Sequence, residues 1–541
     1  MNAPILILNK NAQRETGKEA QMGIITASKA IADIVRSTLG PKAMLKMLLD
    51  PTGSVVLTND GASILREIEV RHPAAKSLIE LSRTQDEQVG DGTTSVVVLA
   101  GELMEAVRPL LSGGMHPSVI VGAYRRAADL SLQALKKCAR EVDPTDPKQL
   151  LSFAVTALGT KQVSRFGNLI PRLAVEAVRT VSFEESGKRT SDLRALVKVE
   201  KVAGGEIDSS RVLKGVMLNK DILHAAMRRR IENPRIMLLD CPLEYKKAES
   251  ETNIEMNRAE DWRKYLDLEE EHIRKLCEAI TALEPDIVIC EKGVSDIAQH
   301  FLLQKNVSVL RRVRKSDLHR LAMATGARVG SNSTSMKETD LGKKCALFEV
   351  RKLGDDYWSF FENCDSPKAC SVLLRGSSSE GLAEIERNLT DAMGVVRNII
   401  MDPRVVPGAG ASEMAMSTVL RKQSREESEA AARVFACAAS ALEIIPKTLG
   451  ENAGANVSQV IAKLRSAHEE NDSLLGVDGD SGEVCDVSEL GVFEPFSVKQ
   501  QAIKTAFETA TVLLRIDDIL SGVSKNPDQQ QMAQQGVPNI Q

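Results

Sequence analysis

The sequence predicts a multidomain α/β protein that is mainly helical at both chain ends and carries an α/β module between them. Its 541 residues are too many for one ordinary core and indicate about three or four domains. Aromatic residues make up only 3% of the chain, so its cores must be built from aliphatic side chains and alanine, which suits packed helices. Short apolar strands alternate with helices only in the middle of the chain.

Helical periodicity and turn residues define the first elements. Apolar residues recur at helical spacing over residues 18–39, and a following Gly-Pro pair ends that helix. The segments KMLLD and SVVLTND, joined by a Pro-Thr-Gly turn at residues 51–53, predict a β-hairpin. A buried helix opened by two threonines is expected over residues 93–111, and an alanine-rich helix over residues 117–138.

The composition and the pattern of apolar residues change in the middle of the chain. A polar stretch with two prolines, residues 141–147, indicates a domain edge. After a second change near residues 206–220, short strands alternate with helices: IMLLD, DIVIC and VSVLRRV. A charged segment over residues 245–275 lies between the first two strands and is polar nearly all round, apart from Trp262 and Leu266. This segment is therefore expected to be solvent-exposed and mobile.

Helical periodicity returns after the strand KACSVLLRG, over residues 381–400, and an Asp-Pro pair breaks it. The rest of the chain again predicts long alanine-rich helices like those of the start, so both ends are expected to belong to one domain. The apolar segments ILIL and TAFETATVLL predict edges that neighbouring chains complete. The Gln-rich end, residues 526–541, predicts a disordered tail.

Composition argues against several classes of protein. Lys and Arg total 70 against 74 Asp and Glu, a net charge of −4, so nothing indicates a nucleic-acid or anionic-membrane surface. No apolar run approaches the ~20 residues that a membrane helix needs, and no basic N-terminal region precedes a signal-like segment. A soluble, cytoplasmic protein is expected.

Cysteine and histidine patterns predict no familiar site. Nine cysteines are scattered without a CxxC pair, which argues against a zinc ribbon or a thioredoxin-like site. Cys364 and Cys370 are close enough for a small disulfide loop, but free thiols are expected in a reducing compartment. The seven histidines show neither HExxH spacing nor a Ser/His/Asp arrangement.

The run GDGTTS at residues 90–95 is the most suggestive for ligand binding. Its glycines allow close backbone approach, and its Thr-Thr-Ser amides lie where a helix begins, which favours phosphate. A carboxylate beside phosphates, here Asp91, is what a bridging Mg²⁺ needs. A glycine-rich turn capped by threonine explains the same residues equally well, so local physics leaves both interpretations open.

The other candidate motifs are weak by themselves. The LGP run at residues 39–41 is a helix stop, and TNDG at residues 58–61 is a strand end and turn. GAGA at residues 408–411 resembles a dinucleotide loop, but Glu413 stands at the third glycine position and no strand clearly precedes it. The chain contains no GxxxxGK[ST] loop, so any ATP hydrolysis proceeds without a P-loop. Asp391 lies off the apolar stripe of its helix, as a solvated residue does.

Taken in order, five segments resemble group II chaperonins: TLGPKAMLKMLLD, VLTNDGASILREI, HPAAKSLIELSRTQDEQVGDGTTSVVVLAGEL, VVPGAGASEMAMS and GVFEPFSVKQQAIKTAFETATVLLRIDDIL. The resemblance covers nearly the whole chain except the Gln-rich tail. Within the family, the middle of the chain is similar to the subunits of the eukaryotic cytosolic TRiC/CCT complex. Several motifs in the right order are far more specific than one alone.

The resemblance implies a chaperonin fold of three domains. An equatorial ATP-binding domain would comprise residues 1–143 and 405–525, and an intermediate hinge domain residues 144–212 and 371–404. An apical substrate-binding domain would comprise residues 213–370, with a lid protrusion at about 245–275. It also implies an ATPase that works with Mg²⁺ and ATP or ADP, with K⁺ as a further candidate ion.

Site residues follow from the same resemblance. Asp91 would hold Mg²⁺, while Asp391 would orient or deprotonate the attacking water with help from Asp60. The remaining positions would bind nucleotide: Gly40, Pro41, Gly92, Thr93, Thr94, Ser95, Thr160, Lys161, Gly410, Gly476, Glu494 and Lys499. Two positions depart from the family pattern: Ala409 replaces the middle glycine of its loop, and Gly159 stands where the hinge motif has Asn.

The partners implied are paralogous subunits in a hetero-oligomeric double ring and non-native client proteins, actin and tubulin among them. Two other functions are alternatives: a chaperonin-derived scaffold that hydrolyses little ATP and a stand-alone metabolic kinase. The joint presence of Asp60, Asp91 and Asp391 argues against the scaffold. The absent P-loop and the long charged segment argue against the kinase.

Overall fold

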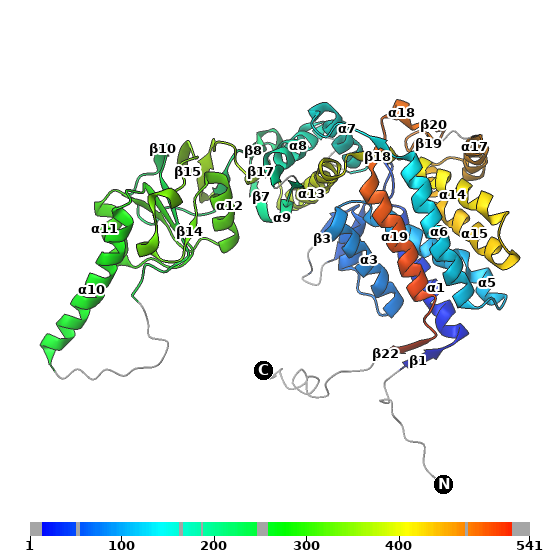
Figure 1. Ribbon diagram of the computed structural model, residues 1–541, viewed down its shortest axis with the longest axis horizontal. Coiled ribbons are helices and arrows are strands. Elements are labelled where there is room, and N and C mark those ends of the chain that lie inside the picture. Colours follow the sequence, from blue (N-terminus) through cyan, green and yellow to red (C-terminus); the bar gives the residue numbers. More distant parts are fainter. Residues whose placement is uncertain are drawn as a thin grey trace, which may run out of the picture. The chain divides into compact units, whose positions relative to one another are not determined.

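The computed structural model describes residues 13–49, 53, 55–161, 166–185, 188–245, 258–470 and 474–521. Four expectations fall partly or wholly outside these residues: most of the turn at 51–53, the segment ILIL, part of the charged segment at 245–275 and the Gln-rich tail. The chain divides into two compact units. Unit 1 comprises residues 1–142, 159–161 and 402–541, and unit 2 comprises residues 143–158 and 162–401. The confirmed architecture is α/β with helices from both chain ends in one unit (Figure 1).

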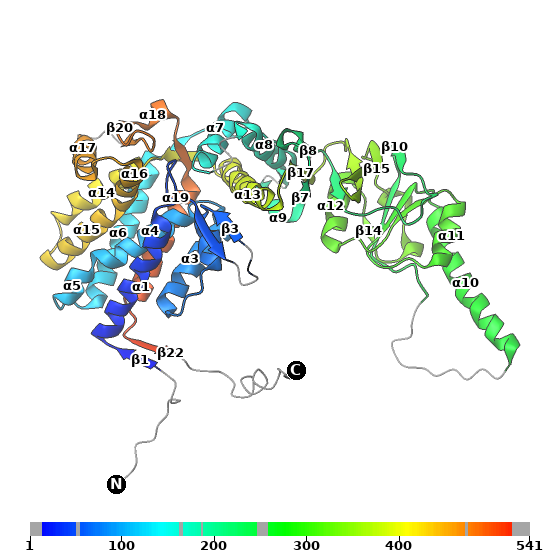
Figure 2. The ribbon, with the colours of Figure 1, turned by 180° about the vertical axis from the view of Figure 1, so that it is seen from behind.

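Unit 1 is a bundle of helices built from both ends of the chain. Its long helices are α1 (Lys18–Arg36), α3 (Pro73–Val89), α4 (Thr93–Ala106), α6 (Pro117–Cys138), α14 (Ala411–Ser424), α15 (Glu429–Leu442) and α19 (Phe496–Leu513). Shorter helices complete it: α2 (Gly61–Glu67), α5 (Arg108–Ser112), α16 (Ile444–Ala453), α17 (Val457–Glu469) and α18 (Val487–Leu490). Figure 2 shows α4, from the N-terminal part, next to α19 from the C-terminal part.

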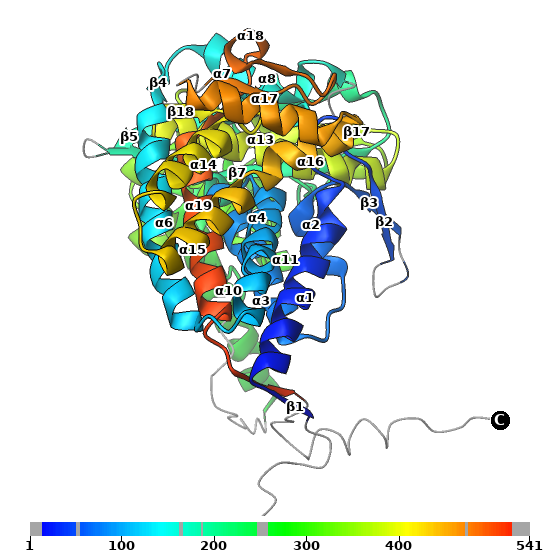
Figure 3. The ribbon, with the colours of Figure 1, turned by 90° about the vertical axis from the view of Figure 1, so that its right-hand side faces the viewer.

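The core of this bundle is almost wholly aliphatic. Four aromatic side chains, those of Tyr124, Phe435, Phe496 and Phe507, lie among buried Ala, Val, Leu and Ile residues. Helix α4 is buried on nearly all sides, because α1, α3, α15 and α19 pack around it (Figure 3). The expected helical core of small aliphatic residues is confirmed.

Unit 1 also contains small antiparallel sheets, which lie at the edges of the helical bundle. They are β1 (Gln13–Thr16) with β22 (Asp518–Ser521), β2 (Lys46–Leu49) with β3 (Val55–Thr58), β19 (Leu475–Val477) with β20 (Val484–Asp486), and the trio β21 (Phe493–Pro495), β18 (Arg404–Pro407) and β4 (Arg140–Glu141). The predicted hairpin is confirmed, with Lys46 opposite Thr58.

Unit 2 begins and ends with helices that pack together: α7 (Pro147–Leu158), α8 (Leu169–Val181) and α13 (Ser379–Met401). Next to them lie β5 (Phe183–Glu185) with β6 (Lys188–Thr190), the short α9 (Leu193–Leu196), and a sheet of β7 (Val197–Ala203), β17 (Cys370–Gly376) and β8 (Arg211–Leu213). Among the described residues of unit 2, single turns of 3₁₀ helix occur at Ile207–Ser209, Ser333–Ser335 and Glu338–Asp340.

Two four-stranded sheets form the middle of unit 2. The parallel sheet has the order β13 (Ser308–Leu310), β12 (Ile287–Cys290), β11 (Ile236–Leu239), β14 (Val329–Gly330). The other sheet has the order β10 (Arg230–Glu232), β15 (Leu347–Leu353), β16 (Asp356–Glu362), β9 (Val216–Leu218). Helices α10 (Ala259–Thr281), α11 (Asp296–Gln304) and α12 (Lys315–Thr325) accompany them. Strands β11 and β12 are buried at every position, as parallel strands covered on both faces are.

Three expectations need correction. The helix expected over residues 93–111 is two helices, because Pro109 stands at the start of α5, where a missing amide is tolerated. A strand, β18, does precede the GAGA run, although none was expected there. The segment TAFETATVLL lies within α19, and most of its apolar side chains are buried in the core, so it is not an edge. Residues 246–257 of the expected charged segment lie outside the described residues. Most of the remainder lies in α10, where Trp262 and Leu266 are exposed.

Candidate functional site

The GDGTTS run forms the tight junction between α3 and α4. Gly90 ends α3 with φ 70°, and Gly92 precedes α4 with φ 75°, both in the left-handed region that glycine tolerates. A Cβ at Gly92 would lie 3.1 Å from Val498 Cγ1, so the backbone also passes close to α19. Thr93, Thr94 and Ser95 are the first three residues of α4, and their amides belong to the turn that has no intrahelical acceptors.

A second helix N-terminus meets this one. Asp60 caps α2, accepting a hydrogen bond from the Ser63 amide at 3.0 Å. A Cβ at Gly61 would lie 2.5 Å from Thr94 Oγ1, so the first turns of α2 and α4 touch. Thr93 Oγ1 lies 3.5 Å from Asp60 Oδ1. Two converging helix N-termini concentrate unpaired amide donors and positive dipole ends at one place.

The segment of residues 159–161 contributes to this cluster in unit 1. The Asn59 side-chain amide donates to the Thr160 carbonyl oxygen at 2.8 Å. Lys161 Nζ lies 3.5 Å from Asp60 Oδ1. Burial alone would raise the pKa of the Asp60 carboxyl, but Lys161 and the hydrogen bonds from Ser63 outweigh it and the net shift is downward. Asp60 is therefore an ionised group next to a cation.

Asp91 lies in the same junction but in a different electrostatic situation. Its Oδ1 accepts a hydrogen bond from the Gly92 amide at 2.6 Å, and its carbonyl oxygen accepts one from Gln85 at 3.0 Å. Burial raises the pKa of the Asp91 carboxyl above its usual value, despite the opposing effect of Lys161 and Lys499. A bound cation would lower this pKa again, because it favours the charged carboxylate.

The GAGA run forms a strained loop between β18 and α14. Ala409 has φ 53° and Gly410 has φ 79°, so two consecutive residues adopt the left-handed conformation. A Cβ at Gly410 would lie 2.8 Å from Pro446 Cβ, and one at Gly476 would lie 2.9 Å from the Ala409 carbonyl oxygen. Ala409 therefore adopts a conformation that glycine tolerates more readily, at a cost of about 1 to 2 kcal/mol. The preceding strand is antiparallel to both neighbours, which excludes a dinucleotide-binding βαβ unit.

Glu494 and Lys499 belong to a buried charge cluster that also contains Glu413. Lys499 Nζ lies 2.5 Å from Glu413 Oε1 and 3.0 Å from Glu494 Oε2. The two glutamates hold the pKa of Lys499 above its ordinary value, although burial opposes them. Burial raises the pKa of the Glu494 carboxyl, since it outweighs the attraction of Lys499. Lys499 is thus neutralised by protein carboxylates.

Gly40 and Pro41 follow the end of α1. Gly40 has φ 91°, and a Cβ there would lie 2.8 Å from Leu449 Cδ2. Pro41 packs against Gly479, where a Cβ would lie 2.4 Å from the proline ring. The two residues therefore belong to a close contact with the C-terminal part of unit 1, which their local sequence did not indicate.

The predicted site residues are thus not all in one unit. Asp391 lies on α13 in unit 2, where it is half-buried and has an interaction with other residues. Every other predicted site residue lies in unit 1. Within unit 1, the contacts above link Asp60, Lys161, the α4 N-terminus, Lys499 and Glu494 into one region.

Three residues of this region were not predicted from the sequence to belong to the site: Gln85, Glu413 and Asn59. Glu413 was noticed only as a mismatch to a glycine motif, and its partner Lys499 is 86 residues away. The position of Glu413 three residues beyond Gly410 was the one available signal, because a carboxylate in the first turn of a helix is a common anchor.

A magnesium–nucleotide complex fits these residues. The side-chain oxygens Asn59 Oδ1 and Gln85 Oε1 are buried without hydrogen-bond partners within the described part of the chain. Such acceptors next to Asp60 and Asp91 suit a hydrated hard cation, which prefers oxygen. In the described ranges, no three or more His, Cys, Asp or Glu side chains cluster as a closed protein cage for a metal. Mg²⁺ itself is commonly held by one or two carboxylates together with phosphates and water.

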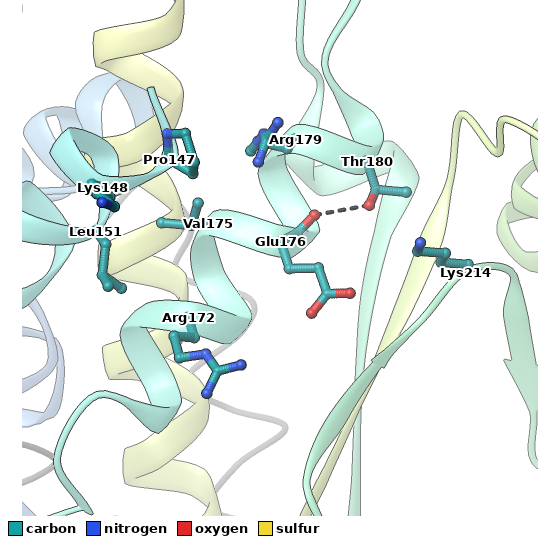
Figure 4. Close-up of a pocket in the computed structure, with 9 residues that line it drawn as sticks. All are labelled: Pro147, Lys148, Leu151, Arg172, Val175, Glu176, Arg179, Thr180 and Lys214. Carbon is teal, nitrogen blue, oxygen red and sulfur yellow. Dashed lines mark hydrogen bonds between the residues drawn. The ribbon is translucent and has the colours of Figure 1, made fainter. Parts of the chain in front are cut away.

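Unit 2 has a separate open pocket of about 640 Å³ (Figure 4). It is lined by α7, α8 and the turn after β8: Pro147, Lys148, Leu151, Arg172, Val175, Glu176, Arg179, Thr180 and Lys214. None of the predicted site residues lines it. The basic and acidic side chains at its rim are exposed and solvated, so the chemistry predicted from the sequence belongs elsewhere.

Helix length and hydropathy were also compared with what a bilayer requires. Of the helices in the described ranges, none combines sufficient length with an apolar stretch that could cross a membrane.

Comparison with known proteins identifies the family. The model of the TCP-1/cpn60 chaperonin family matches residues 31–523. The chain is 51% identical over 528 residues to T-complex protein 1 subunit gamma of Schizosaccharomyces pombe, covering 98% of this chain and 100% of that protein. It is 50% identical over 537 residues to the subunit of the same name from Homo sapiens, covering 99% and 98%. The Xenopus laevis subunit gamma is 50% identical over 526 residues, covering 97% and 96%. The chain belongs to the TCP-1/cpn60 chaperonin family.

Proposed function

We propose that this chain is an ATP-hydrolysing subunit of a double-ring cytosolic chaperonin that encloses and folds non-native proteins. The observation that supports it most is the meeting of two helix N-termini at Gly61 and Thr94, with Asp60 and Asp91 beside them. Unpaired amides favour phosphates, and the carboxylates suit the cation that accompanies ATP. The family and the names of the relatives support the same function.

Each part of the site has a proposed role. The amides of Gly92, Thr93, Thr94 and Ser95 donate to phosphate oxygens, and Lys161 compensates negative charge near Asp60. Asp91 would hold Mg²⁺, which would supply positive charge that stabilises the phosphates during transfer. The positive-φ loop with Gly410 lines the adenosine side together with Gly476 and Glu494. Gly40 and Pro41 contact the nucleotide through their backbone, and Thr160 approaches it beside Asn59.

Lys499 acts on its neighbours and not on the nucleotide. Its ammonium group is buried and paired with Glu413 and Glu494, so we propose that it fixes the position of Glu494. This assignment refines the role that the resemblance implies for Lys499. K⁺ remains a further candidate ion.

Asp391 is proposed to orient or deprotonate the water that attacks the γ-phosphate, with Asp60 assisting. This role follows from the resemblance to chaperonins. The same resemblance leads us to propose that residues 144–212 and 371–404 form a hinge domain and residues 213–370 a substrate-binding domain. Positioning and charge neutralisation supply most of the rate enhancement in phosphoryl transfer, so no covalent intermediate is needed.

The proposed partners are paralogous subunits in a hetero-oligomeric double ring. The relatives described above are named as gamma subunits of T-complex protein 1, which implies further kinds of subunit for those proteins. The clients proposed are non-native proteins, actin and tubulin among them.

The test is nucleotide turnover in the native assembly. The assembly that contains this chain is purified, and ATP hydrolysis and refolding of denatured actin are measured with and without Mg²⁺. Mg²⁺-dependent hydrolysis coupled to refolding supports the chaperone function of the assembly, and crosslinking of nucleotide to this chain tests its own site. An assembly that captures actin but neither hydrolyses ATP nor releases folded protein would contradict it and favour the scaffold.

A further inference from the structure

Two buried cysteines face each other at the end of a sheet in unit 2. In the hairpin of β15 and β16, Leu347 pairs with Glu362 and Phe348 with Phe361. The same antiparallel register continued by two residues places Cys345 opposite Cys364. A hydrogen bond from the Asp365 amide to the Lys344 carbonyl oxygen, at 2.8 Å, keeps the two segments together beyond the strand ends, although Asn363, with φ 56°, interrupts the extended backbone before Cys364.

Directly opposed residues of an antiparallel pair have Cβ atoms about 4.5 to 5.5 Å apart. Disulfide bonds need Cβ atoms about 3.5 to 4.5 Å apart, so a small adjustment suffices. Both thiols are free and buried, with exposed fractions of 1% and 5%, and they are close enough for each to shift the pKa of the other. Cys370, the nearer neighbour in sequence, points elsewhere, since its Sγ lies 3.8 Å from the Ala177 carbonyl oxygen.

The two thiols differ in acidity. The hydrogen bond from Cys364 lowers the pKa of Cys345, although burial opposes it. The hydrogen bond to Cys345 and burial together raise the pKa of Cys364. Cys345 is therefore the better thiolate, and the thiolate is the form that attacks a disulfide.

We propose that Cys345 and Cys364 are an oxidisable dithiol that forms an intramolecular disulfide by exchange with a low-molecular-weight disulfide such as oxidised glutathione. The Cys345 thiolate attacks one glutathione sulfur, forming a mixed disulfide and releasing one glutathione thiolate. Cys364 then loses its proton and attacks Cys345 Sγ, which forms the protein disulfide and releases the second glutathione. Two protein thiols are oxidised by two electrons, and one glutathione disulfide is reduced to two thiols that take up the two protons.

Local opening gives the oxidant access. Both thiols are buried, but Asp365 and Ser366 beside Cys364 are exposed, so opening of this short segment is sufficient. The disulfide would then hold the ends of β15 and β16 together at the start of the connection to β17. This inference does not depend on the proposed ATPase function.

The test is thiol mapping of the full chain in its native assembly. The protein is equilibrated with reduced and oxidised glutathione at increasing proportions of the oxidised form, quenched with acid, alkylated and digested without reduction. The expected result is simultaneous loss of two alkylatable thiols and appearance of a peptide that links Cys345 to Cys364. Amide exchange at Asp365 should slow in the same samples, because the hydrogen bond to Lys344 opens less often.

Two variants provide the controls. Cys345→Ser should remove the linked peptide, whereas Cys370→Ser should leave it unchanged. A link between Cys364 and Cys370 in the wild-type chain overturns the proposal. So does the finding that both Cys345 and Cys364 stay alkylatable at every glutathione ratio, or that they carry only glutathione adducts. The wild-type measurement decides the matter even if a variant fails to fold.

Discussion

At the scale of single residues, the two carboxylates Asp91 and Asp391 have separable roles. Asp91→Ala removes the proposed metal ligand, so it should weaken binding of Mg²⁺-ATP at this subunit. Asp391→Ala removes the group proposed to act on water, so it should leave binding largely intact and slow hydrolysis by roughly 10² to 10⁴. Because other subunits would mask bulk turnover, the measurement is nucleotide occupancy at this subunit by site-directed crosslinking. Loss of nucleotide in the Asp391 variant with normal binding in the Asp91 variant would reverse the assignment.

The buried pair of Lys499 and Glu413 allows a second prediction at this scale. Lys499→Met leaves the buried Glu413 carboxylate and the half-buried Glu494 carboxylate without their cation, so it should destabilise the chain by about 3 kcal/mol. Adding Glu413→Gln removes one of the two carboxylates and should recover part of that loss. The measurement is the urea midpoint of Glu413→Gln, Lys499→Met and the double variant. A double variant as unstable as the sum of the single ones would show that the pair is not coupled.

Residues in local motifs were predictable from the sequence, whereas their long-range partners were not. The glycines of GDGTTS already indicated a tight junction before a helix, because φ near +70° is a local requirement. The pair of Glu413 and Lys499 could not be predicted, since its members are far apart in sequence and only the packing of α14 against α19 brings them together. Cys345 and Cys364 were missed for the same reason: sheet register, and not spacing, makes them neighbours.

At the scale of elements, the contact between the first turns of α2 and α4 organises the proposed phosphate site. Gly61→Ala places a methyl group 2.5 Å from Thr94 Oγ1 and 3.1 Å from the Thr94 backbone nitrogen, so the two helices must separate. Nucleotide affinity should fall about tenfold or more, because a displaced helix end misdirects its amides. Gly122→Ala in α6 is the matched control, since it is also a helical glycine but has no atom within 4 Å of the added group. The measurement is nucleotide occupancy at this subunit in each assembly, by site-directed crosslinking over a range of nucleotide concentrations, and equal affinities would contradict the prediction.

Glu443 joins three helices and makes their packing sensitive to pH. Its carboxylate is fully buried and lies 2.8 Å from Arg421 on α14 and 2.6 Å from Arg465 on α17. Burial alone would raise its pKa, but hydrogen bonds and charge from the two arginines outweigh this, and the net shift is downward from 4.5. A lowered pKa stabilises the folded chain above the unfolded-state value, so this contribution should disappear as the pH falls below 4.5.

Glu443→Gln should therefore cost about 2 kcal/mol at neutral pH, a value that allows for the partial exposure of both arginines. The difference between wild type and variant in urea midpoint should shrink as the pH is lowered through the acid range. Arg433→Ala is the control, since its pair with Glu429 is exposed and contributes little. A difference that stays constant down to pH 3 would show that the carboxylate is not the source of the effect.

Helices with a strong, continuous apolar periodicity were predicted correctly, whereas helix boundaries that depend on a single residue were not. Helix α6 spans the predicted residues because an amphipathic pattern runs between Pro117 and Cys138 without interruption. The pattern over residues 93–111 is equally continuous, but Pro109 divides it into α4 and α5. The strand before the GAGA loop was overlooked because it is only four residues long and ends in proline.

At the scale of the whole molecule, the proposed assembly explains an exposed apolar hairpin. Met47 and Leu49 on β2 are each 71% exposed, and Leu57 on β3 is 47% exposed. A two-stranded hairpin is marginally stable by itself in water, and its free edges invite pairing with another chain. Neighbouring subunits of a ring would cover both the apolar side chains and the open edges.

The chain should therefore not persist as a monomer in the cell. Sedimentation of native extract should place it mainly in a particle many times its own mass of 58.9 kDa. Replacing Met47 and Leu49 by glutamate should shift it toward small species, because charge opposes burial of the hairpin. Leu490→Glu is the control, since that side chain is 42% exposed on the short helix α18, away from the hairpin strands. Recovery of the wild-type chain chiefly near its monomer mass would contradict the assembly. Equal incorporation of the hairpin variant would show instead that other surfaces hold the ring together.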